Sequence, residues 1–183
     1  MKLHVVALSL LLACVVAGCA PIVPQRTKPG GSARWAESIA LDRALTWSKD
    51  ARLCRILGTG IGNEGWLPDR GGAWLLHFWS AGKPRVLQVE VDSDGGTQIR
   101  ELDDAAARGR DLPEGWSDSP SVWAATQRHL AQEPLNTFDA VFAYDAEPER
   151  YGDRAVWRIR FWQAGNTYET HVVGADGEWL TSY

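Results

Sequence analysis

Positive charge is in short supply in this chain, which carries 19 lysine and arginine residues against 23 aspartate and glutamate residues. A net charge of −4 offers no basic surface of the kind that neutralises phosphates, so the composition argues against nucleic acid as a partner. Hydrophobic residues make up 45% of the chain and charged residues 23%. This balance is typical of a globular protein and excludes an intrinsically disordered one.

The N-terminal hydrophobic run is too short to cross a membrane. Val5 to Ala17 gives 13 residues interrupted by Ser9, whereas a transmembrane helix needs about 20 apolar residues. Lys2 precedes the run and supplies a positive charge. This pattern predicts a secretory signal peptide over residues 1–18. The proline- and glycine-rich stretch that follows, residues 19–32, is expected to be a flexible tether.

The end of the predicted signal peptide, Val16-Ala17-Gly18-Cys19, resembles the lipobox of bacterial lipoproteins. The resemblance implies cleavage before Cys19, diacylglycerol on its thiol and acylation of the new amine. Several acyl chains together anchor a protein stably to the lipid bilayer. Ala20, where an aspartate would favour the inner membrane, implies an outer-membrane location facing the periplasm. The alternative is an ordinary secretory signal that happens to contain a cysteine.

Cysteine is scarce: the chain has three, and two of them, Cys14 and Cys19, belong to the predicted signal peptide and lipidation site. Cys54 alone remains, which excludes a disulfide within the exported chain. Its apolar neighbours predict a small buried residue rather than a nucleophile, because no base or orienting group lies near it in the sequence.

Two similar stretches organise the rest of the chain, Ala73 to Gly96 and Val156 to Gly177. Each has the skeleton W-x-x-x-F-W-x-A-G followed by a strand pattern and an Asp-Gly turn, which predicts a β-hairpin. In the first, Trp74, Leu76 and Phe78 share one face, and the other face is also fairly apolar, so we expect this strand to be covered on both sides. In the second, the turn is one residue shorter, which leaves the faces of its second strand unassigned.

The segments before each hairpin predict a helix and a first strand. In the first copy, the helix is expected over residues 34–50 with Ser32 as N-cap, and the strand over residues 53–57. Apolar residues near helical spacing define the expected buried face: Trp35, Ile39, Leu41, Ala44, Leu45 and Trp47. In the second copy, the helix is expected over residues 120–132 with Ser119 as N-cap, and the strand over residues 138–144.

The predicted fold class is therefore α+β, with two tandem helix-plus-antiparallel-sheet repeats over residues 33–102 and 119–183, joined by a linker over residues 103–118. Each repeat resembles the PepSY-type module, through its helix, its W-x-x-x-F hairpin and its V-D-S-D-G-G or V-G-A-D-G-E turn. The resemblance implies a small sheet crossed by a helix, found in exported proteins as a regulatory or inhibitory module. The tandem arrangement is also similar to β-lactamase-inhibitor-type repeats, whose paired sheets form a concave protein-binding face, although this chain has no disulfide within a repeat.

The glycine-rich stretch from Gly58 to Gly72 predicts a mobile loop that exposes Trp66 as a partner-binding side chain. It contains the letters Gly-x-Gly-x-x-Gly of a dinucleotide site. That site needs a helix directly after it to hold the pyrophosphate, and the following Trp-Leu-Pro-Asp cannot begin one. No cofactor is therefore expected. The ten tryptophans of the chain are expected to be core or interface anchors.

Catalytic chemistry is not indicated by the sequence. His77, His129 and His171 lack the spacing of a zinc site, and no nucleophile motif or phosphate loop is present. The chain is thus predicted not to be an enzyme and to hold no metal. Two hypotheses follow: a non-catalytic module that binds or inhibits another envelope protein, and an accessory or structural lipoprotein of an envelope assembly complex.

Overall fold

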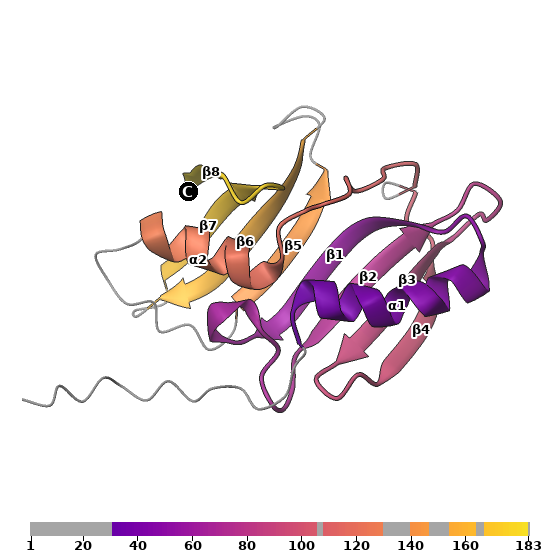
Figure 1. Ribbon diagram of the computed structural model, residues 1–183, viewed down its shortest axis with the longest axis horizontal. Coiled ribbons are helices and arrows are strands. Elements are labelled where there is room, and N and C mark those ends of the chain that lie inside the picture. Colours follow the sequence, from indigo (N-terminus) through magenta and orange to yellow (C-terminus); the bar gives the residue numbers. More distant parts are fainter. Residues whose placement is uncertain (1–30, 106–107, 130–139, 147–153, 164–166, 183) are drawn as a thin grey trace, which may run out of the picture.

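The computed structural model describes residues 31–105, 108–129, 140–146, 154–163 and 167–182. Within them the chain forms an α+β fold, in which two α-helices and a short 3-10 helix accompany one antiparallel sheet of eight strands (Figure 1). The elements in chain order are α1 Ala33–Trp47, β1 Arg52–Ile61, η1 Asn63–Gly65, β2 Ala73–Trp79, β3 Val86–Asp92, β4 Thr97–Leu102, α2 Ser119–His129, β5 Ala140–Ala146, β6 Ala155–Gln163, β7 Thr167–Gly174 and β8 Trp179–Ser182.

The strands lie in the order β4-β3-β2-β1-β5-β6-β7-β8, so β1 and β5 meet at the centre as an antiparallel pair. Figure 1 shows both helices on the same side of the sheet. Helix α1 lies over the group of strands β1–β4, and helix α2 lies over the group β5–β8. We call this side the front face and the opposite side the back face. The predicted α+β class is confirmed, and the two groups of strands join edge to edge into one sheet.

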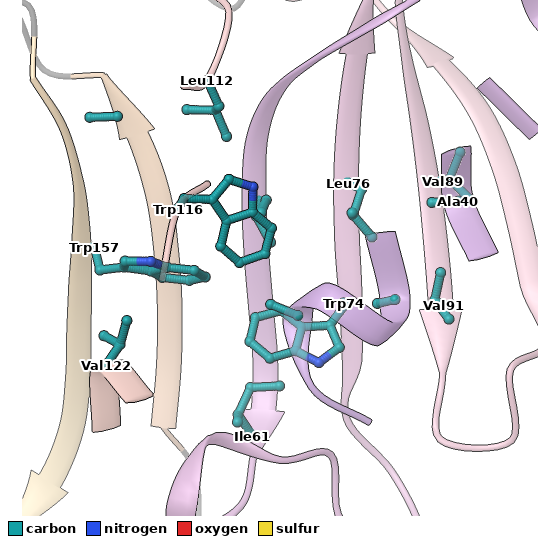
Figure 2. Close-up of a cluster of buried hydrophobic side chains, with 14 of the residues drawn as sticks. Ala40, Ile61, Trp74, Leu76, Val89, Val91, Leu112, Trp116, Val122 and Trp157 are labelled. Atoms are coloured by element: carbon teal, nitrogen blue, oxygen red, sulfur yellow. The ribbon is translucent and has the colours of Figure 1, made fainter. Parts of the chain in front are cut away.

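Large side chains of β2 and β3 fill the front of the sheet, as the alternation predicted. Trp74, Leu76 and Phe78 of β2 are fully buried, and the paired strand β3 adds Leu87, Val89 and Val91. Figure 2 shows this cluster continuing toward Trp116 and Trp157 in the centre of the protein. A single apolar core therefore spans both groups of strands.

Helix α1 rests on this core through small residues, not through the large ones expected from the sequence. Its buried stripe is Ala33, Ala36, Ala40 and Ala44. Trp35 and Ile39 are only partly buried, and Leu41 is 40% exposed. The indole of Trp74 and its neighbours already fill the space above the sheet, so the helix can approach only where its side chains are short.

Strand β1 is longer than predicted, and Gly58 to Ile61 belong to it instead of to a loop. Gly58 lies opposite Trp74, and a Cβ atom at this position would come within 2.5 Å of the Trp74 ring. Gly60 has a φ of +61°, where the pairing with β5 is interrupted by a bulge. These glycines therefore permit close approach and a bulge, two roles that glycine has inside strands.

Other predicted boundaries shift by small amounts. Helix α1 ends three residues before the predicted residue 50, and its N-cap is Ser32 as expected. Helix α2 begins at Ser119, and the first carbonyl in its hydrogen-bond ladder is that of Asp118, so Asp118 caps the helix in place of Ser119. Strand β5 runs two residues beyond the predicted end at residue 144. The expected parts at residues 130–132 and 138–139 lie outside the described residues.

The Asp-Gly turn of the first hairpin is confirmed. The carboxylate of Asp92 accepts hydrogen bonds from the backbone amides of Asp94 and Gly96, at 2.9 and 2.8 Å. The register that the sequence left open is also resolved. Val91 lies opposite Trp74 and Val173 opposite Trp157, so the two valines occupy corresponding positions on the front face.

Candidate functional site

The first turns of the two helices are tied together. The side chain of Ser119 accepts a hydrogen bond from the amide of Ala33 at 3.0 Å and donates one to the carbonyl of Gly65 at 2.7 Å. The carboxylate of Asp118 accepts from the amide of Arg34 at 2.9 Å. Amides in the first turn of a helix have no partner within the helix, so these contacts complete the start of α1. Residues from the start of α2 thus fix the position of α1.

The chain between β4 and α2 is described at residues 103–105, which lie on the back of the sheet, and at residues 108–118, which reach its front, and we call these described residues the strap. Its first fastening is an ion pair on the back face, where Asp104 Oδ2 lies 2.8 Å from Arg55 Nη1. Arg55 pairs across the sheet with His77, whose side chain points away from the helices. The prediction that β2 is covered on both faces is thereby confirmed, because His77 is only 4% exposed.

A second fastening holds the strap at the start of β1. The carboxylate of Asp111 bonds Arg52 Nη1 at 2.7 Å and accepts from Trp79 Nε1 at 2.6 Å. One residue later, the amide of Leu112 donates to the carbonyl of Leu53 at 2.9 Å. This part of β1 precedes the pairing with β5, which begins at Ile56, so the strap occupies an otherwise open strand edge.

A cleft of about 540 Å³ opens on the front face between α1, the start of β1 and the strap. Its apolar residues come from these three elements and from the end of β2: Leu41, Leu53, Phe78, Leu112, Pro113 and Trp116. Charged residues line it as well: Arg34, Glu37, Arg52, Asp111 and Glu114. Five of the twelve lining residues are charged, so the cleft is more polar than a typical small-molecule pocket and suits a ligand that has polar as well as apolar groups.

Most of the charges around the cleft are already paired. Arg34 bonds Glu37 at 3.0 Å and the carbonyl of Trp116 at 2.6 Å, and its guanidinium stacks 3.8 Å above the Trp116 ring. Arg52 is held by Asp111. Glu114 makes no hydrogen bond or ion pair within the part of the chain that the structure describes. These contacts fix the walls of the cleft, while Glu114 stays available to a ligand.

The titratable groups of the first half do not form a nucleophile and base. Cys54 is buried, burial raises the pKa of its thiol to about 12, and its Sγ donates to the carbonyl of His77 at 3.2 Å. Burial also lowers the pKa of His77, with the charge of Arg55 adding to the effect. Across the described residues, no three His, Cys, Asp or Glu side chains are grouped so that they could hold a metal ion.

Of the other candidate residues named from the sequence, the structure describes the side chain of Trp66 but not those of Cys19, His129 and His171. Trp66 is half-buried, in contrast to the exposed side chain predicted, because the loop is held at both sides of it. Gly65 packs against Ser119, and the amide of Leu67 donates to the carbonyl of Gly31 at 2.8 Å. Cys19 lies outside the described residues, and the side chains of His129 and His171 lie outside those described.

The cleft residues of the strap were not predicted from the sequence, where residues 103–118 were interpreted only as a linker. A local signal was present, because Asp111 and Trp116 flank a Leu-Pro pair in a segment that is otherwise polar. Apolar residues inside a polar connection indicate contact with the folded body. The sequence could not indicate which element they would contact.

Comparisons with protein-family models, curated proteins and solved structures gave no match for this chain. In the described residues, neither helix has the length and apolar character needed to cross a lipid bilayer. The fold and the cleft thus define an α+β protein with a two-layer body and a mixed-polarity cleft beside α1.

Proposed function

We propose that this chain is a lipid-anchored lipoprotein of the bacterial cell envelope that binds or inhibits another envelope protein without catalysing a reaction. The lipobox-like sequence at Cys19 supports the anchor. The cleft beside α1 supports binding, and it is the single observation that carries this part of the proposal. Its walls are fixed by ion pairs and hydrogen bonds before any ligand arrives, which reduces the entropy lost on binding.

The proposal includes two tandem PepSY-like units, residues 33–102 and 119–183. Support comes from the order of elements, since a helix followed by four antiparallel strands occurs twice. It also comes from Trp74 and Trp157, which stand at corresponding positions of β2 and β6 and whose indole nitrogens donate to the carbonyls of Gly31 and Ser117. Each of these carbonyls lies two residues before a helix.

Leu41 gives the sharpest test of the cleft, because it is a cleft residue with 40% exposure. A charge placed there should block an apolar contact with little effect on the core. The matched control is Ile99, which is 51% exposed on the edge strand β4 and does not line the cleft. Leu41→Asp should lose most of the captured partner when the tagged protein is purified from solubilised membranes, and Ile99→Asp should retain it.

The identity of the captured material separates the two hypotheses from each other. One stoichiometric protein that depends on Leu41 supports a binding or inhibitory module. A multi-protein assembly machine captured equally by both variants supports the accessory lipoprotein instead. Trp66 remains a predicted second contact, and Trp66→Ala tests it separately, since a loss of affinity without a loss of thermal stability is expected.

The anchor has its own test. Intact-mass measurement of the purified protein should show an N-terminus at Cys19 that carries acyl chains, and Cys19→Ala should release the protein from the membrane fraction. An unmodified N-terminus would remove the lipoprotein part of the proposal. It would leave the cleft unaffected, because the cleft lies wholly within the described residues.

A further inference from the structure

His77 is buried on the back face without the polar contacts that a buried imidazole normally has. Its side chain is only 4% exposed, and within the described residues neither ring nitrogen has a partner in good hydrogen-bond geometry, although a weak contact with the Gln88 side chain acts on its pKa. Gln88, which lies opposite His77 on β3, is 6% exposed, and its amide nitrogen also has no such partner. Buried polar groups are nearly always paired, because leaving them unpaired costs free energy. This exception calls for a functional explanation.

The strap covers this imidazole with a carboxylate. Asp104 Oδ2 lies 4.0 Å from His77 Nδ1, too far for a hydrogen bond, while it bonds Arg55 Nη1 at 2.8 Å. The ring therefore has Arg55 of β1 on one side and Asp104 of the strap on another. Strand β3 adds only the uncharged Gln88, and Cys54 of β1 contacts the backbone carbonyl of His77.

We propose that the strap is an acid-sensitive fastening: protonation of His77 releases the Asp104 end of the strap from the back face of the sheet. A proton on the imidazole places a second cation beside Arg55, on a ring that is only 4% exposed beneath an ion pair whose side chains are 25% and 22% exposed. The new charge can be hydrated only if the segment above it moves away. This inference concerns the back face and does not depend on what binds in the cleft.

The electrostatics of the site agree with this direction. Burial lowers the pKa of His77 and Arg55 lowers it further, while Asp104 and a side-chain contact with Gln88 raise it by smaller amounts. A histidine that is exposed to water has a pKa of about 6.5. The opened state therefore binds more protons than the closed state once the pH falls below about 6.5, so acid favours opening. Above that pH the ring is neutral in both states, and the strap stays fastened.

Cys54 reports on this opening, because it lies on the back face beside His77 and is only 3% exposed. The full chain is treated at about pH 7.5 and about pH 5 with a dipyridyl disulfide, a thiol reagent that remains active in acid. Peptide mapping then identifies labelling at Cys54. Dividing each rate by that of the unfolded chain at the same pH gives a protection factor that is free of the thiol's own pH dependence.

The proposal predicts that the protection of Cys54 falls about tenfold or more on acidification. Between the pKa of the opened imidazole, about 6.5, and the lower pKa of the buried imidazole, each pH unit shifts the equilibrium toward the open state by about tenfold. His77→Gln should keep its protection at both pH values, because glutamine does not titrate. Asp104→Asn should be poorly protected at both. The matched control is Asp111→Asn, which weakens the other fastening and should retain the pH dependence of the natural chain.

Two results would overturn the proposal. The first is protection of Cys54 that is unchanged or increased in acid, which would mean that the charged ring closes the 4.0 Å gap and holds Asp104 more firmly. The second is an equal loss of protection in His77→Gln. If that variant fails to fold, nuclear magnetic resonance of the natural chain provides a second test, because it follows the titration of the His77 ring signals. Their titration midpoint must coincide with the midpoint for Cys54 labelling, and different midpoints contradict the proposal.

Discussion

The indoles of Trp74 and Trp157 meet edge to face at the centre of the protein, with ring centroids 6.4 Å apart and an angle of 76° between their planes. Both are fully buried, and each donates a hydrogen bond of 3.0 Å to a carbonyl just before a helix, at Gly31 and Ser117. These two side chains connect the β2 and β6 strands, the starts of both helices and the shared core (Figure 2).

Replacing these tryptophans by phenylalanine should have unequal effects. The carbonyl of Gly31 also accepts from the amide of Leu67, so Trp74→Phe leaves it paired. The carbonyl of Ser117 loses its one donor among the described residues in Trp157→Phe, which adds about 1–3 kcal/mol to the cost of the smaller ring. Chemical denaturation of both variants measures this difference. Equal or reversed losses would contradict the assigned hydrogen bonds.

Gly58 is expected to tolerate no side chain. In Gly58→Ala the new methyl group would lie 2.5 Å from the Trp74 ring and 2.7 Å from Ile61, which forces the core to shift. Overpacking of this kind costs about 1–3 kcal/mol of unfolding free energy. Gly82 is the control, because its nearest neighbour would lie 3.9 Å away, and Gly82→Ala should be close to neutral. A stable Gly58→Ala protein would show that the indole is placed differently.

Ser119 should contribute more stability than an ordinary serine. It is fully buried, and Ser119→Ala removes the acceptor for the amide of Ala33 together with the donor to the carbonyl of Gly65. Because the amide of Ala33 and the carbonyl of Gly65 would then be buried without a partner, the free energy of unfolding should fall by about 2–4 kcal/mol. Thermal and chemical unfolding measure this loss. Ser38 on the exposed side of α1 is the control, and Ser38→Ala should change stability by less than about 0.5 kcal/mol. Similar small effects at both positions would rule out this link between the helices.

Asp50 should stabilise the folded state at neutral pH and lose this effect in strong acid. Hydrogen bonds from Ser48 and Ser80 lower its pKa from 3.8 to about 2, and the bonds join the α1–β1 turn to the end of β2. A lowered pKa means that the folded state favours the carboxylate, so this contribution is present above about pH 4 and is lost as the pH falls through 2. Asp50→Asn should therefore raise the pH of acid unfolding, followed by circular dichroism. Asp42→Asn on exposed α1 is the control and should leave that pH unchanged.

The hairpins were the most predictable part of the fold, because period-two alternation fixed the buried face of β2 and the Asp-Gly letters fixed its turn. The buried face of α1 was not predictable, since hydrophobic size alone favoured Trp35 and Leu41 over the alanine stripe. The choice depends on Trp74 filling the space beneath the helix. The length of β1 was missed for a related reason: Gly58 reads locally as a loop residue, yet it is required by a side chain that lies 16 positions away along the chain.

The candidate site depends on contacts between residues far apart in the sequence, which explains why so little of it could be predicted. Asp104 and Asp111 appear as solvated linker charges until the fold brings them to Arg55 and Arg52. The alternation along β2 places His77 on the face opposite Trp74. It could not show that the strap would cover that face, because the path of a linker is decided by partners that only the folded sheet assembles.

The most direct test of the account is site-specific photo-crosslinking from the cleft in intact cell envelopes. A photoreactive amino acid replaces Leu41 in one protein and Ile99 in another, and both variants are exposed to light before the membranes are dissolved. The account predicts one discrete protein adduct from position 41, absent at position 99, with the tagged chain in the membrane fraction. Adducts of the same pattern from both positions, or none from position 41, would contradict it.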